Sequence, residues 1–183
     1  MASVVDRIQK DIFRLKKELT AARRALPPEP VRDYAFTGRG GESLTLSALF
    51  GERNDLLVLH NMGRSCSYCS LWADGLNGLL PHMLERAAFV LDSPNDWETQ
   101  ERFARERGWR FLMVTSGDST FRRDMSFQGE DGDPYPGISA FHKSDDGAIH
   151  RVGSTWLGPG DDFCPVWPIF DLFPDGPAGW EPK

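Results

Sequence analysis

Cysteine is scarce in this sequence, and long apolar runs are absent. Three cysteines in 183 residues are too few for a disulfide scaffold, so a close cysteine pair is better suited to catalysis or metal binding. No stretch reaches the roughly 20 apolar residues of a membrane span. Charged side chains at positions 6, 7, 10 and 11 exclude the apolar part of a signal peptide. We therefore expect a cytoplasmic protein with no membrane partner.

The sequence also lacks a surplus of basic charge. Its net charge of −6 argues against a nucleic-acid partner, because nucleic acids bind to basic surfaces. The charge is uneven, however: residues 1–26 hold seven basic and three acidic side chains, which makes this segment +4 and the remainder −10. We interpret the basic segment as a solvated helix face. The alternative is an arm that docks on an acidic surface of its own chain or of a partner.

Residues 3–26 show the pattern of one amphipathic helix. The apolar residues recur at intervals of four and three, the period of a coiled coil: Ile8, Ile12, Leu15, Leu19, Ala22 and Leu26. Pro27 and Pro28 end the helix. Such an apolar seam needs a cover, supplied either by the body or by a second copy in a homodimer. We therefore predict an N-terminal helical segment over 1–30 and a body over 31–183.

Strand and helix patterns alternate along the body. Leu56–Leu59 is a continuous apolar run, typical of a strand buried on both faces, and the helical pattern after Cys69 contains Pro81, which predicts a kink or a break. Further strands are predicted over 34–36, 87–91 and 111–114, helices over 96–107, 119–125 and 163–172, and a hairpin from 138–142 and 149–152. This order predicts an α/β fold with a mixed central sheet and helices on both faces.

Cys66 and Cys69 form a C-x-x-C motif between the apolar strand and the helix that follows. Unpaired backbone N–H groups and the helix dipole favour negative charge at a helix start. The pKa of a thiol there should fall, so Cys66 is the predicted nucleophile. Cys69 lies one turn further along, close enough to resolve a mixed disulfide. The motif therefore predicts thiol–disulfide exchange.

Two other interpretations of the cysteine pair remain open. The pair can be two small buried residues, or it can be half of a zinc site. Zinc takes four ligands, and the other candidates show no ligand-like spacing: Cys164, His60, His82, His142 and His150. We expect neither a metal nor a cofactor, and we expect Cys164 to be a passive thiol.

The residues around the motif resemble a bacterial thioredoxin-like family known as domain of unknown function 899. The resemblance is most specific in Cys66-Ser67-Tyr68-Cys69-Ser70-Leu71-Trp72-Ala73-Asp74, within Leu56 to Gly78, and it extends to Ala21–Pro27, Gly108–Phe111 and Asp171–Pro174. The loop before the cysteines is shorter here than in the family's usual pattern. The resemblance implies the thioredoxin fold and implies no substrate.

Two further residues occupy positions that thioredoxins use. A buried carboxylate stands six residues before the first cysteine in those proteins, and His60 takes that place here. An imidazole beneath the cysteines can accept the Cys69 proton near neutral pH; the alternative is a structural, hydrogen-bonded ring. Thioredoxins also have a cis-proline just before a strand that faces the cysteine pair, and Pro136 resembles it in placement. We expect a cis bond here, although an ordinary trans turn is the usual form.

Other residues near the motif are predicted to contact a substrate. Arg64 precedes the cysteine pair by two residues, and Tyr68 lies between the two cysteines. With Pro136 they form the predicted substrate-binding set. Arg64 can also stabilise the Cys66 thiolate, or it can point to solvent. Adjacent Arg122 and Arg123 are expected to be solvated, with an anion contact as the alternative.

Three functions are compatible with these features. The leading one is a dithiol oxidoreductase that acts on a protein or small-molecule disulfide or thiol. The second is a peroxiredoxin-like thiol peroxidase, but such sites have a proline and a Thr or Ser shortly before the reactive cysteine, whereas Gly63 stands three residues before Cys66. The third is a non-catalytic interaction module, since fold alone does not settle function.

Overall fold

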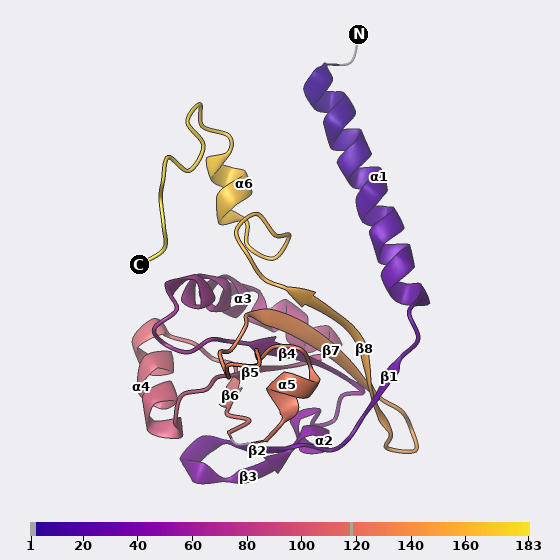
Figure 1. Ribbon diagram of the computed structural model, residues 1–183, viewed down its shortest axis with the longest axis vertical. Coiled ribbons are helices and arrows are strands. Elements are labelled where there is room, and N and C mark those ends of the chain that lie inside the picture. The colour runs from indigo at the N-terminus through magenta and orange to yellow at the C-terminus, as the bar shows by residue number, and fades with distance from the viewer. Residues whose placement is uncertain (1–2, 118) are drawn as a thin grey trace.

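The computed structural model describes residues 3–117 and 119–183. Figure 1 shows a central mixed sheet, whose strands follow the order β1 (Glu29–Val31), β8 (Ile149–Trp156), β7 (Gly137–Lys143), β4 (Asp55–His60), β5 (Ala88–Asp92) and β6 (Leu112–Val114). Strands β4, β5 and β6 are parallel, whereas β7, β8 and β1 join by antiparallel pairing. A second, two-stranded sheet pairs β2 (Ala35–Thr37) with β3 (Ser43–Thr45).

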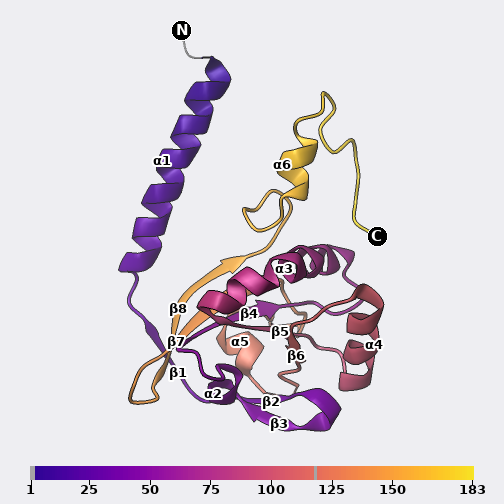
Figure 2. The same ribbon diagram turned by 180° about the vertical axis from the view of Figure 1, so that it is seen from behind.

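Helices cover both faces of the sheet (Figures 1 and 2). Side chains of α3 (Ser67–Arg86) and α4 (Trp97–Arg107) pack on one face. Those of α2 (Leu46–Leu49) and α5 (Phe121–Asp124) pack on the other. The remaining helices are α1 (Val4–Ala25), α6 (Val166–Phe170) and the 3₁₀ turn η1 (Arg39–Gly41). The predicted α/β class, mixed sheet and closing hairpin are confirmed.

Strand β4 separates the two halves of the core. Successive side chains of a strand point to opposite faces. Leu56 and Val58 therefore join the cluster that contains Phe121, whereas Leu59 joins the cluster that contains Trp72 of α3. Apolar side chains cover both faces of this strand, which explains why its sequence is a continuous apolar run.

Of the kink or break predicted at Pro81, the structure rules out the break. Helix α3 is a single element from Ser67 to Arg86, with Pro81 inside it. Proline cannot donate a hydrogen bond to the carbonyl four residues earlier, which here belongs to Asn77. The Nη2 atom of Arg110 donates to this oxygen at 3.4 Å, so the acceptor that proline leaves free has a partner and the helix continues.

Helix α1 stands apart from the sheet (Figures 1 and 2). Its start is a capping box in which the side chains of Ser3 and Asp6 each accept from the other's backbone N–H. None of its residues, Val4 to Ala25, is buried, so the body does not cover the seam. The predicted helix is confirmed; residues 1–2 of the expected N-terminal segment lie outside the described residues. Among the described helices, none is both long and apolar enough to cross a membrane.

Candidate active site

The loop between β4 and α3 places the two cysteines at the carboxyl end of the parallel strands. Asn61 Oδ1 accepts from the Gly63 N–H at 2.7 Å, and Asn95 Oδ1 accepts from the Arg64 N–H at 2.8 Å. Gly63 has a φ of +100°, and a Cβ atom there would lie 2.9 Å from Asn95 Oδ1. Glycine is therefore required for both the turn and the close approach.

Cys66 is the N-cap residue of α3. Its Sγ accepts from the backbone N–H of Cys69 at 3.2 Å. A hydrogen bond from the Cys69 thiol and backbone N–H groups of the first helical turn lower the pKa of Cys66 to about 6, against the opposing effect of partial burial. A lowered pKa favours the thiolate form of Cys66, and the residue is half-exposed. Reactive cysteines share these two features.

Cys69 is the buried partner, with 3% of its surface exposed. Its hydrogen bond to Cys66 and its burial raise its pKa. The Cys69 Sγ also accepts from the Met62 N–H at 3.4 Å. The two pKa values therefore shift in opposite directions, so that of the two thiols Cys66 loses its proton first. All three cysteines of the chain are free thiols in this structure.

His60 lies at the end of β4, but its ring is on the sheet face opposite to α3. It is 1% exposed, stacks on Phe127 with 4.0 Å between ring centroids, and places Nε2 2.9 Å from Ser139 Oγ. The expected position beneath the cysteines is therefore corrected, because strand alternation turns residue 60 toward the side of Val58. Burial, helped by the positive charges of Arg122 and Arg151, lowers the pKa of His60 well below its usual value. A proton-acceptor role for His60 stays a prediction, and this environment opposes it.

Pro136 lies at the same end of the sheet as the cysteine loop, since the next residue, Gly137, pairs with His60. The expected cis bond is wrong: every peptide bond among the described residues is trans. The trans form is the more stable one for an X–Pro bond, and the Pro136 carbonyl accepts from the Leu157 N–H at 3.2 Å. The substrate-binding role of Pro136 stays a prediction.

Arg64 and Tyr68 differ in their surroundings. Arg64 is exposed and is not among the groups that lower the pKa of Cys66. Tyr68 is half-buried, and its ring lies parallel to that of Trp167 with 6.1 Å between centroids. Trp167 belongs to α6, so the aromatic contact ties the C-terminal segment to the first turn of α3. Their proposed contacts with substrate stay predictions.

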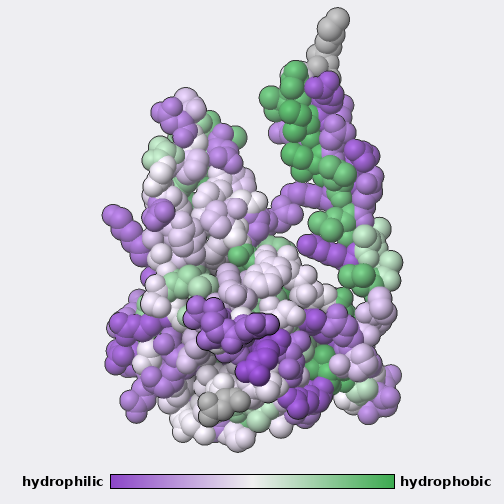
Figure 3. Space-filling view, in the orientation of Figure 1, coloured by the Kyte–Doolittle hydropathy of each residue, from purple (hydrophilic) through white to green (hydrophobic). Residues whose placement is uncertain are grey.

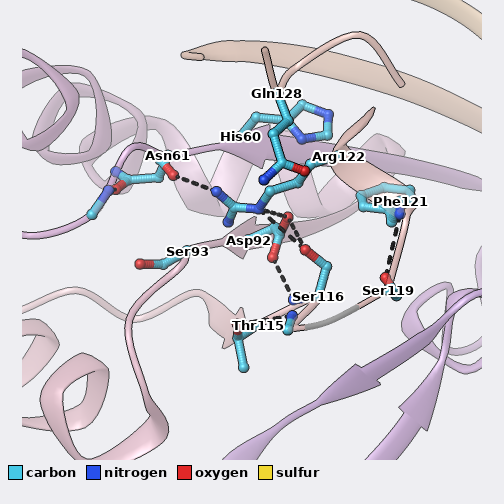
Figure 4. Close-up of polar contacts among 12 residues, drawn as sticks. His60, Asn61, Asp92, Ser93, Thr115, Ser116, Ser119, Phe121, Arg122 and Gln128 are labelled. Carbon is cyan, nitrogen blue, oxygen red and sulfur yellow. Dashed lines mark hydrogen bonds and ion pairs between the residues drawn. The ribbon is translucent and has the colours of Figure 1, made fainter. Parts of the chain in front are cut away.

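A buried ion pair beside the loop was missed in the sequence (Figure 4). Arg122 Nε lies 2.9 Å from Asp92 Oδ2, with side-chain exposures of 7% and 0%. Ser116 donates to both carboxylate oxygens of Asp92, at 2.8 and 3.0 Å. Arg122 Nη1 donates to the Asn61 carbonyl at 3.1 Å, so the pair holds the residue that begins the cysteine loop. The expectation that Arg122 is solvated is wrong, whereas Arg123 is exposed.

The third cysteine, Cys164, lies outside the C-x-x-C motif. Cys164 is buried with Trp72 and Trp167 in the core on the α3 face. Burial raises its pKa, which fits the expected passive thiol. No group of three or more His, Cys, Asp or Glu side chains suited to a metal ion occurs within residues 3–117 and 119–183.

This is a thioredoxin-fold protein with a C-x-x-C dithiol. The mixed sheet, the helices on both of its faces and the cysteine pair at the start of α3 define this class. The chain belongs to the family of bacterial proteins of unknown function DUF899, whose sequence model matches residues 7–179. The resemblance seen in the sequence is thereby confirmed. No curated protein is similar enough in sequence to match this chain.

Solved structures of similar fold include three bacterial proteins. PrxQ of Xylella fastidiosa, solved as a cysteine-to-serine mutant, is 14% identical, with a TM-score of 0.59 over 70% of this chain and 83% of that one. Peroxidoxin BcpB of Mycobacterium tuberculosis is 20% identical, with a TM-score of 0.52 over 67% and 80%. The bacterioferritin comigratory protein of Xanthomonas campestris is 18% identical, with a TM-score of 0.55 over 68% and 79%. At these identities the likeness shows the thioredoxin-like fold alone.

Proposed function

We propose that this protein is a thiol–disulfide oxidoreductase in which Cys66 is the nucleophile and Cys69 the resolving cysteine. One observation carries the proposal: Cys66 caps α3, where its Sγ accepts from the N–H of the buried Cys69 at 3.2 Å. In this setting the pKa of Cys66 falls to about 6 while that of Cys69 rises. One sulfur is ready to attack at neutral pH, and the other stays protonated until it is needed.

The exchange proceeds in two balanced steps. The Cys66 thiolate attacks one sulfur of a substrate disulfide, forms a mixed disulfide and releases the other sulfur as a thiolate. Cys66 then has no negative charge, so the hydrogen bond that held the Cys69 proton weakens and that proton passes to the departing thiolate or to water. The Cys69 thiolate attacks the Cys66 sulfur, which releases the second substrate sulfur as a thiolate and leaves the Cys66–Cys69 disulfide. A dithiol reductant returns the pair to its starting state.

The reducing pool of the cytoplasm suits this cycle, because it keeps cysteines in the thiol form from which Cys66 attacks. We therefore place the protein in the cytoplasm and expect its substrate to be a protein or small-molecule disulfide.

The test is a disulfide-mapping experiment on the folded protein. Oxidised glutathione is added, free thiols are blocked with a maleimide, and intact and peptide masses are measured. We expect a Cys66–Cys69 disulfide in the wild type and in Cys164→Ser, a glutathione adduct on Cys66 in Cys69→Ser, and none in Cys66→Ser. Free Cys66 and Cys69 in the oxidised wild type, with circular dichroism unchanged, would contradict the proposal.

A turnover assay separates this function from its alternatives. The oxidoreductase should reduce insulin disulfides with dithiothreitol as the electron source, and Cys164→Ser should match the wild type. Consumption of hydrogen peroxide without insulin reduction would make the protein a thiol peroxidase instead. Failure in both assays by a protein that forms the internal disulfide would favour the non-catalytic module.

A further inference from the structure

Helix α1 presents an apolar seam that the described parts of its own chain leave open. Its central residues, Ile8, Ile12, Leu15 and Leu19, are between 46% and 53% exposed. Figure 3 shows hydrophobic residues along the side of α1 that is turned toward the C-terminal segment. Hydrophilic residues lie along the opposite side of the helix. An exposed apolar stripe of this length marks an interaction surface.

The spacing of the seam fits another helix. In a heptad frame that starts with Val5 at position a, the a positions are Val5, Ile12, Leu19 and Leu26, and the d positions are Ile8, Leu15 and Ala22. This is the repeat by which two helices pack knobs into holes. Val5 and Ile12 at a, with Leu15 at d, are the residues that two-stranded parallel coils prefer, whereas Ile8 at d and Leu19 at a are residues of coils with more strands. The flanking charges are the observation that selects the pairing.

The charges that flank the seam decide the orientation of such a pair. Position g holds Asp11 and Glu18, and position e holds Lys16 and Arg23. In a parallel pair each g residue faces the e residue five positions later on the partner, so Asp11 faces Lys16 and Glu18 faces Arg23. In an antiparallel pair g faces g and e faces e, so like charges meet. The charges of α1 therefore complement those of an identical, parallel helix.

Contacts within one chain do not remove this complementarity. Asp11 and Glu18 pair with Arg14 of the same helix at 3.6 and 2.8 Å, and Lys16 pairs with Asp162 at 2.6 Å, all between exposed side chains. Exposed pairs of this kind contribute little and exchange partners readily. They leave the seam itself uncovered, since none of the residues of α1 is buried.

We infer that two copies of this chain associate through a parallel two-stranded coiled coil of their α1 helices. The bodies then lie at the same end of the coil, beyond Pro27 and Pro28. This inference does not depend on the proposed thiol chemistry, because it rests on α1 alone.

Sedimentation equilibrium of the full chain tests the association. We expect a mass twice the 20.6 kDa of one chain, and we expect Ile12→Glu to shift it to that of a single chain. Phe13→Glu is the matched control: it places the same charge one residue further on, at the exposed position b outside the seam, and it should remain a dimer. A single-chain mass for the wild type at every concentration, or equal dissociation by both variants, would overturn the inference.

A pair of charge reversals tests the orientation. Glu18→Lys and Arg23→Glu should each weaken the parallel dimer, because each sets like charges against one another at g and e. An equimolar mixture of the two variants restores opposite charges at both contacts, so it should dimerise better than either variant alone. Stronger self-association of Glu18→Lys would instead show an antiparallel pair, in which the introduced lysine faces Asp11 of the partner helix. Circular dichroism of each variant confirms that α1 remains helical.

Discussion

At the scale of single residues, the chemistry of the site depends on which sulfur holds the proton. The largest effect on the pKa of Cys66 is the hydrogen bond from Cys69, and burial works against it. Without the Cys69 donor, the effect of burial, which raises the pKa of Cys66, should be offset less. Cys69→Ala should raise the midpoint of iodoacetamide labelling of Cys66 from about 6 toward the value of an ordinary thiol, about 8.5.

Cys69→Ser is the control for that measurement, since a hydroxyl still donates to the Cys66 sulfur. Its midpoint should lie between those of the wild type and Cys69→Ala. The labelling rate is followed by mass spectrometry across pH with Cys164→Ser as the background. A midpoint in Cys69→Ala equal to that of the wild type would place the cause in the backbone N–H groups of α3 instead.

The buried ion pair of Arg122 and Asp92 should matter more for stability than any exposed charge. Arg122→Met leaves the Asp92 carboxylate buried without its partner, which costs about 3–5 kcal/mol of the free energy of unfolding. Arg123→Met, the exposed neighbour, should change it by about 0.5 kcal/mol or less. Urea denaturation of the two variants makes the comparison, and similar values for both would mean that Asp92 is satisfied by Ser116 alone.

His60 should make stability depend on pH. Burial lowers its pKa in the folded state, whereas an unfolded His titrates at about 6.5. Below that value the unfolded chain takes up a proton that the folded chain does not, so the free energy of unfolding falls with falling pH, by up to about 1.4 kcal/mol per unit.

Urea denaturation of His60→Gln between about pH 8 and about pH 5 checks this window, which follows from linkage. The variant should be less stable than the wild type at neutral pH and should lose this part of the slope. His82→Gln, at an exposed position of α3, should keep it. If His60→Gln kept the full slope, His60 would titrate in the folded protein as it does in the unfolded chain, and burial would not lower its pKa.

At the scale of elements, the start of β7 is held by close packing. A Cβ atom on Gly137 would lie 1.9 Å from Phe127 Cε1 and 2.7 Å from the Thr155 carbonyl oxygen. Gly137→Ala should therefore destabilise the protein by about 1–3 kcal/mol. Gly153→Ala, in β8 with open space around it, should have little effect in the same thermal denaturation experiment. Equal melting temperatures for both variants would mean that Phe127 moves aside without cost.

Sequence patterns identified most elements because their signals are local. The seam from Ile8 to Leu26 predicted α1, and the apolar run Leu56–Leu59 predicted β4. The same run could not predict where His60 points, since a strand buried on both faces carries no alternation to set its register. The pairing of Asp92 with Arg122, 30 residues apart in sequence, depends on how β5 and α5 meet in space, and a single sequence does not record that meeting.

At the scale of the whole molecule, α1 and the cysteine pair are separate parts. The described contacts of α1 with the body, such as Lys16 with Asp162, do not involve Cys66 or Cys69. Ile12→Glu should therefore abolish the dimer while leaving the labelling midpoint of Cys66 near 6. Labelling the variant and the wild type at the same protein concentration checks this, and a shifted midpoint would show that dimerisation reaches the site.

The short strand β1 joins these two parts, and its pairing has a consequence for where the chain can be cut. β1 covers the first three residues of β8, Ile149 to Arg151, and Glu29 Oε2 accepts from Arg151 Nε at 2.9 Å. A cut between the end of α1 at Ala25 and the start of β1 at Glu29 would release α1 and leave this edge covered. Loss of the chain through Val31 would instead bare the backbone of β8, and an uncovered edge strand invites other chains to add to the sheet and precipitate.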